Sequence, residues 1–139
     1  MTNLQSWQDT LAVEHAVIYS LGVVGATPGL AESAQAALNA HRARRAACIN
    51  AVIESGGTPV ASAPAYEVDT DVVQAPTDQP ARQLAAGLEQ SACAAYVALS
   101  SSSDRRSRLS AAQWLRESAV AQVLWIGEVP ALPGLEPSP

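Results

Sequence analysis

Four ionisable residues stand at positions where a helix packed against other helices would carry a hydrophobic residue. They are Glu14, His41, Glu89 and Glu117. Each interrupts a series of apolar residues spaced alternately by three and four, which is the spacing of a buried helix face. Each also lies within about one turn of the midpoint of its own predicted helix, and side-by-side helices of similar length bring their midpoints to one level. The sequence therefore predicts three carboxyl groups and an imidazole that meet in the centre of a helical bundle.

Three interpretations of this cluster stay open. In the first, the three glutamates supply oxygen ligands and His41 a nitrogen ligand to a metal ion, a ligand set that suits iron or manganese. In the second, no cofactor is bound and a buried arginine neutralises the carboxylates, because an unpaired buried charge costs several kcal/mol. Arg45 is the best placed partner, with Arg44 and Arg116 as alternatives. In the third, the cluster lines a pocket for a small molecule. We favour the ion-pair network, since a fixed guanidinium would also repel a metal cation.

We identify no catalytic residues in the sequence, and no cofactor motif outside this cluster. It contains no glycine-rich phosphate loop, no zinc-type cysteine spacing and no GxSxG nucleophile motif. Cys48 and Cys93 fall in different predicted helices, and we expect both thiols to be reduced and buried.

Proline, glycine and capping residues divide the sequence into four helical segments. We predict helices over residues 4–24, 28–55, 78–99 and 104–127, with Thr27 as the N-cap of the second. Residues 57–76 carry three prolines and form a long crossover between the second and third helices. Such a connection lets two helices run parallel, as in the ferritin-like topology. The predicted fold is all-α: a ferritin-like four-helix bundle over residues 1–127, followed by a proline-rich tail over residues 128–139.

The composition favours closely packed helices and argues against several partners. Hydrophobic residues make up 48% of the chain and aromatic residues only 4%, and alanine is abundant, so the helices must approach closely to fill a core. The formal net charge is −5 and every basic residue is arginine, so we expect no binding to nucleic acid or to a membrane. The N-terminus lacks a basic region followed by an apolar stretch, which predicts a cytoplasmic protein without a signal peptide. The alanine-rich helix faces favour a homo-oligomer, with a dimer as the simplest case.

Short motifs are spread along the chain: AVEHAVIYSLGVVGA with Glu14, His15 and Tyr19, HRARR from His41 to Arg45, the Gly57-Thr58-Pro59 turn, Tyr66, Glu89, and Pro133-Gly134. Together they resemble the motifs of an actinobacterial ferritin-like family of unknown function. The resemblance covers most of the chain. It implies a ferritin-like fold and brings no established activity.

The resemblance also implies a reduced set of metal ligands. Diiron members of the wider ferritin-like group use a lone Glu on the first and third helices and a Glu-x-x-His motif on the second and fourth. Glu14 and Glu89 match the lone carboxylates. Leu38 stands three residues before His41, and Val120 stands three residues after Glu117, so both Glu-x-x-His motifs are incomplete. The departure argues against a standard dinuclear centre, while a mononuclear site stays open.

Overall fold

The computed structural model describes residues 3–74 and 77–135, and these residues form helices and connections without any strand. The five helices are α1 (Asn3–Gly25), α2 (Ala31–Glu54), α3 (Thr70–Gln74), α4 (Asp78–Leu99) and α5 (Arg105–Ile126). The all-α prediction is confirmed. Pro76, the predicted end of the crossover, and the last four residues of the predicted tail lie outside the described residues. No described helix has the length and hydropathy needed to cross a membrane.

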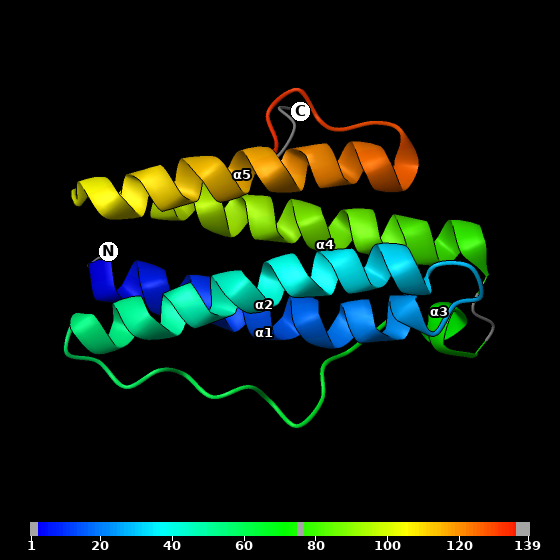
Figure 1. The fold of residues 1–139 in the computed structure, drawn as a ribbon, viewed down its shortest axis with the longest axis horizontal. Helices are drawn as coiled ribbons and strands as arrows, with labels where there is room; N and C mark the ends of the chain where they lie inside the picture. The colour runs from blue at the N-terminus through cyan, green and yellow to red at the C-terminus, as the bar shows by residue number, and fades with distance from the viewer. Residues whose placement is uncertain (1–2, 75–76, 136–139) are drawn as a thin grey trace.

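Four long helices lie side by side (Figure 1). α1 and α2 form one antiparallel hairpin, α4 and α5 form another, and the hairpins pack together through α1 and α4. The connection of residues 55–69 runs along the outside of the first hairpin and returns the chain to the end where α2 began, so α4 runs in the same direction as α2 (Figure 1). Within the described residues α2 and α5 make no contact of comparable extent, and a groove lies between them.

The interface between the two hairpins relies on small side chains of α4. Ala81, Ala85 and Ala92 are fully buried in the same hydrophobic cluster as Leu11 and Leu21 of α1. Alanine leaves little side-chain volume between two backbones, so helices that meet through it can lie close and still fill the space. This close packing brings the midpoints of α1 and α4 together.

The crossover is fastened to α1 by polar and aromatic side chains. Gln8 Oε1 accepts a hydrogen bond from the Val60 N–H at 2.9 Å. His15 Nε2 lies 3.0 Å from the Val60 carbonyl oxygen, and a carbonyl can only accept, so Nε2 donates. Further along α1, the ring of Tyr19 packs on that of Tyr66 with 5.6 Å between the centroids. Three motif residues of the sequence, His15, Tyr19 and Tyr66, thus hold the crossover in place.

The start of α2 differs from the prediction that Thr27 caps it. α2 begins at Ala31, because the chain first completes a turn in which the Leu30 N–H donates to the Thr27 carbonyl at 3.1 Å. Gly29 in this turn has a φ of 84°, which lies outside the right-handed helix and is favourable mainly to glycine. The helix therefore cannot include Pro28 and Gly29.

The start of α5 is tied to α1. Asp104 stands at the start of this helix, as predicted, and its carboxylate accepts a hydrogen bond from the Ser107 N–H at 2.8 Å. The Ser107 hydroxyl oxygen accepts a bond from Trp7 Nε1 at 3.1 Å. The Trp7 ring meets the Trp114 ring edge to face, with 6.0 Å between centroids. One aromatic residue near the N-terminus thus fixes both the cap and the first turns of α5.

The described part of the tail, residues 128–135, returns over the second hairpin (Figure 1). At Gly134 the backbone of the tail lies against the backbone of α4: a Cβ added to Gly134 would stand 2.5 Å from the Cys93 carbonyl carbon. The φ of Gly134 is 84°, so both the space and the backbone conformation require glycine. Leu132 and Leu135 stay exposed, and the backbone at Gly134 anchors the tail.

Candidate functional site

His41 bridges two glutamates at the centre of a buried polar network. Its Nδ1 lies 2.7 Å from Glu14 Oε2 on α1, and its Nε2 lies 3.1 and 3.2 Å from the two carboxylate oxygens of Glu89 on α4. His41 itself belongs to α2 and is 1% exposed, while Glu14 and Glu89 are 0% and 2% exposed. One imidazole ring therefore joins three helices across the interface of the two hairpins.

The surroundings of His41 favour its charged form. Burial lowers the pKa of His41, but the hydrogen bonds and negative charges of Glu14 and Glu89 outweigh burial and raise this pKa from 6.5 to about 9. The ring is therefore an imidazolium at neutral pH. Both ring nitrogens then carry a hydrogen, and each donates to one of the two glutamates.

Tyr96 connects this bridge to a buried arginine. The Tyr96 hydroxyl donates to Glu14 Oε1 and accepts a hydrogen bond from Arg44 Nη1 at 3.1 Å. The Arg44 guanidinium also lies 5.5 Å from the centroid of the Tyr96 ring, in the range of a cation–π contact. Burial and the charge of Glu14 raise the pKa of Tyr96, so its hydroxyl keeps its proton as a donor.

Arg44 extends the network to α5. Its Nη1 donates to Ser118 Oγ at 2.8 Å, and its Nη2 donates to Glu117 Oε2 at 2.9 Å. Gln113 Nε2 donates to the other oxygen of Glu117 at 2.9 Å. Burial raises the pKa of Glu117, but the bonds from Gln113 and Arg44 outweigh burial and lower it overall. The Glu117 side chain is 40% exposed, so water screens part of this ion pair.

All four residues that the sequence singles out belong to this network. Glu14, His41 and Glu89 are in direct contact, and Glu117 joins them through Arg44 and Tyr96. The placement at one level follows from their midpoint positions in helices of similar length. The network thereby links α1, α2, α4 and α5.

The arginine of the network is Arg44 and not the expected Arg45. On the buried face of α2, His41 follows Leu38 by three residues, and Arg44 follows His41 by three again. A strict alternation of three and four would instead put Arg45 on this face after His41. Arg45 is half-buried beside it, and no hydrogen bond or ion pair of Arg45 is found among the described residues. Arg116, the other alternative, is exposed.

The sequence gives no clear sign of two further members of the network. Tyr96 follows Glu89 by two helical turns and so shares its face, but a tyrosine on a buried face is most often a packed aromatic residue. Ser118 lies in an alanine-rich helix where a small polar residue is unremarkable. Only the position of the Arg44 side chain shows that both hydroxyl groups are needed as its partners.

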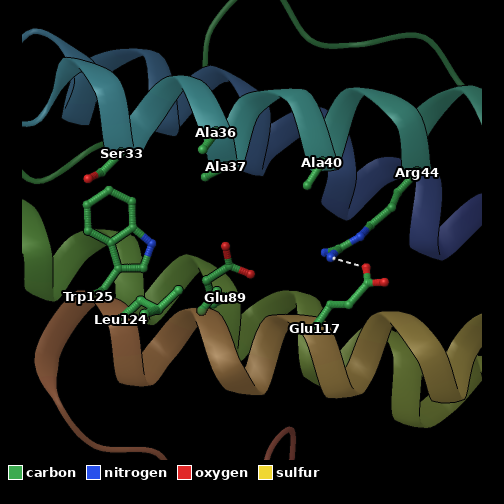
Figure 2. A pocket seen from close by; sticks show the side chains of 10 residues that line it. Ser33, Ala36, Ala37, Ala40, Arg44, Glu89, Glu117, Leu124 and Trp125 are labelled. Atoms are coloured by element: carbon green, nitrogen blue, oxygen red, sulfur yellow. Dashed lines mark hydrogen bonds and ion pairs between the residues drawn. The ribbon is translucent and has the colours of Figure 1, made fainter.

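A groove of about 530 Å³ opens beside the network, between α2 and α5 (Figure 2). Small residues of α2 form one wall, and Leu124 and Trp125 of α5 contribute to the other. Glu89 lies between Trp125 at one end and the Arg44–Glu117 pair at the other, as Figure 2 shows. The groove therefore brings solvent to the edge of an otherwise buried carboxylate.

The cluster as placed does not fit a metal ion. A histidine ligand needs a free lone pair on one ring nitrogen, and both ring nitrogens of His41 face glutamate oxygens at hydrogen-bond distance, so neither faces an open ligand position. In the two described ranges, no group of three or more His, Cys, Asp or Glu side chains is arranged to hold a metal. Iron or manganese could use His41 only if its ring left at least one of the two carboxylates.

The two cysteines lie near this network as unreactive thiols. Cys48 and Cys93 are both free and buried. Burial and the charge of Glu89 raise the pKa of Cys93 to about 11, and burial raises that of Cys48 as well. Because the thiolate is the reactive form, neither residue is suited to act as a nucleophile.

The comparison with known proteins places the chain in a family. Residues 6–137 match the family described as a domain of unknown function (DUF4439). The chain belongs to the DUF4439 family. A solved structure similar to this DUF4439 chain is the crystal structure of a conserved hypothetical protein, Rv2844, from Mycobacterium tuberculosis. The two share 32% sequence identity at a TM-score of 0.80, over 88% of this chain and 93% of that chain. No curated protein matches the DUF4439 chain at a significant level.

We expect the stability of the DUF4439 chain to fall as pH rises through the pKa of His41. The folded-state pKa is raised from 6.5 to about 9, so the stabilisation is complete below pH 6.5 and is lost progressively toward pH 9. Between pH 6.5 and 8.5 the free energy of unfolding should decrease by about 2–3 kcal/mol, measured by urea denaturation. His41→Gln should be less stable at pH 6.5 and should lose little more over this range. Parallel pH profiles of the two proteins would refute a charged His41.

The choice between Arg44 and Arg45 can be tested with a matched pair of variants of the DUF4439 chain. Arg44→Ala should lower the free energy of unfolding by about 3 kcal/mol, because Tyr96 and Ser118 lose a buried partner and the charge of Glu14 loses a nearby cation. Arg45→Ala should change it by less than about 0.5 kcal/mol. Both changes in the free energy of unfolding are to be measured by chemical denaturation at pH 7. Equal losses in the two variants would show that Arg44 is not the arginine of the network.

Proposed function

We propose that this DUF4439 chain is a ferritin-like four-helix bundle without catalytic activity, held together by its central polar network and acting through self-association. The connections support the bundle assignment. Two antiparallel hairpins are joined by a long crossover, with α2 and α4 parallel, and this is the arrangement expected of a ferritin-like bundle.

The double pairing of His41 is the observation that carries the non-catalytic assignment. The resemblance to diiron ferritin-like proteins implies that this level of the bundle is where those proteins hold positive metal ions between carboxylates. In this chain an imidazolium stands between Glu14 and Glu89, and the Arg44 guanidinium supplies a second positive charge. A buried network whose donors and acceptors are paired with one another restrains the fold.

The two incomplete ligand motifs support the same proposal. Val120, three residues after Glu117, is 55% exposed, so a histidine at this position would stand on the outer side of α5. Leu38, three residues before His41, belongs to the hydrophobic core. Neither position offers a metal ligand. Iron or manganese binding by the four remaining residues is the alternative function, and the first experiment below separates the two.

The outer face of α5 supports self-association. Val120, Val123 and Leu124 are exposed neighbours on this helix, and Leu109 lies on the same face beyond the exposed Arg116. Adjacent exposed apolar side chains on one helix mark a contact surface, and a second copy of α5 offers a surface of the same chemistry. The net charge of −5 supports a protein partner over nucleic acid or an anionic membrane, and free buried thiols agree with a cytoplasmic location.

Metal uptake tests the non-catalytic assignment. We expect protein purified without chelators, and again after anaerobic addition of Fe(II) or Mn(II), to hold no stoichiometric metal by inductively coupled plasma mass spectrometry. The physical reason is that His41 has no free lone pair while it bridges two carboxylates. Stoichiometric iron or manganese that disappears in Glu14→Ala and His41→Ala would establish the metal-binding alternative instead.

Sedimentation tests self-association. We expect the wild-type chain to sediment as a dimer at micromolar concentrations and Val120→Asp to sediment as a monomer, because a buried unpaired carboxylate would oppose contact through this face of α5. Leu132→Asp is the matched control, since Leu132 is also an exposed apolar residue and lies in the tail. A monomeric wild type, or a Val120→Asp variant that stays dimeric, would contradict the proposal.

A further inference from the structure

The groove between α2 and α5 is lined in part by a buried carboxylate that has one hydrogen-bond donor among the described residues. Glu89 is 2% exposed, and its only hydrogen-bond donor among the described residues is the single Nε2–H of His41, which both carboxylate oxygens share. A carboxylate offers about four lone-pair sites. Acceptor capacity therefore remains on Glu89, and Glu89 is one of the groove residues (Figure 2).

The charges around the groove favour a cation. The network holds three carboxyl groups, on Glu14, Glu89 and Glu117, against the two cationic groups of His41 and Arg44. Arg44 lines the same groove, but its hydrogen bonds among the described residues go to Tyr96, Ser118 and Glu117 and not to Glu89. A positively charged group beside Glu89 would complete the charge balance and supply the missing donors, whereas an anion would meet two nearby carboxylates.

The remainder of the groove is apolar. Ala36, Ala37 and Ala40 of α2 and Ala121 of α5 keep it open because their side chains are small. Trp125 closes the end opposite to the Arg44–Glu117 pair and offers an indole face (Figure 2). Aromatic faces attract both apolar groups and cations, and a volume of about 530 Å³ suits a small organic molecule.

We propose that the groove between α2 and α5 binds a small organic cation, with an ammonium or guanidinium group at Glu89 and an apolar body against Trp125. Leu124 belongs to both the groove and the self-association surface, whereas the other groove residues lie outside that surface. Val120 and Val123 lie roughly 100° or more around α5 from Ala121 and Trp125, so a contact through Val120 leaves the groove to the ligand.

Isothermal titration calorimetry with three probes of similar size tests the proposal. 2-Phenylethylammonium should bind the wild-type chain at pH 7, 2-phenylethanol should bind at least about tenfold more weakly, and 3-phenylpropionate should bind more weakly still. Equal binding of the alcohol and the ammonium, or no binding of the ammonium at millimolar concentration, would overturn the proposal.

Three variants locate the site. Glu89→Gln keeps an acceptor for His41 and removes the charge, so it should weaken binding of the ammonium about tenfold and leave binding of the alcohol unchanged. Ala40→Phe fills the groove from an exposed position outside the polar network, and it should weaken binding of both probes. Glu54→Gln, an exposed carboxylate paired with Arg106, is the control and should bind as the wild type does. Unchanged affinity for the ammonium in Ala40→Phe and Glu89→Gln would overturn the proposal.

Sedimentation with saturating ammonium gives a further control on the occupant. We expect the oligomeric state to stay as it is without ligand. A shift from dimer to monomer as the ammonium binds would mean that a second copy of the chain occupies the groove, and would overturn the assignment to a small molecule.

Discussion

The fold depends on the pairing of one imidazolium with two carboxylates. Burial of Glu14 and Glu89 without a partner would cost several kcal/mol for each group, and His41 offsets both costs at once because each ring nitrogen donates to one glutamate. The three residues lie on three different helices, so the helices must keep their relative heights for the bridge to form. Tyr96 and Arg44 carry this constraint to the fourth long helix. The polar centre therefore fixes the register of helices whose alanine-rich faces would otherwise slide.

One side of the same network is open to the groove, because α2 and α5 do not pack closely against each other. Glu14 is enclosed by donors from His41 and Tyr96, whereas Glu89 and Glu117 border the groove and Glu117 reaches solvent. Unused acceptor capacity on Glu89 therefore lies on the open side, beside the Arg44–Glu117 pair. A protein that only required a stable core would gain from closing this groove with larger residues on α2, and the small residues there keep a charged wall accessible.

The sequence predicts most of the framework and the polar positions but not their pairing. Helical periodicity and the long proline-bearing connection are enough to predict helices and a crossover, and Glu14, His41, Glu89 and Glu117 are found because charge breaks an apolar series. Arg44 and Arg45 lie within about 100° of each other on a helix, so periodicity alone cannot decide which side chain turns inward. α2 starts later than predicted. The local Thr-Pro pair favours a cap at Thr27, but the positive φ of Gly29, which the sequence pattern does not reveal, keeps the helix from starting there. Contacts between hairpins, such as that of Tyr96 with Glu14, depend on packing that no local pattern encodes.

The crossover has a consequence for the order of assembly. Contacts within each hairpin join residues that are close in sequence, such as Glu14 and His41, whose positions differ by 27. The bond of His41 to Glu89 spans 48 residues and the bond of Tyr96 to Glu14 spans 82, so both require the two hairpins to meet and bear the entropy of closing a long loop. Within the first hairpin alone, the imidazole of His41 has only one glutamate partner, Glu14. The doubly bridged ring exists only after docking, so the second hydrogen bond of one histidine marks the joining of the two halves of the chain.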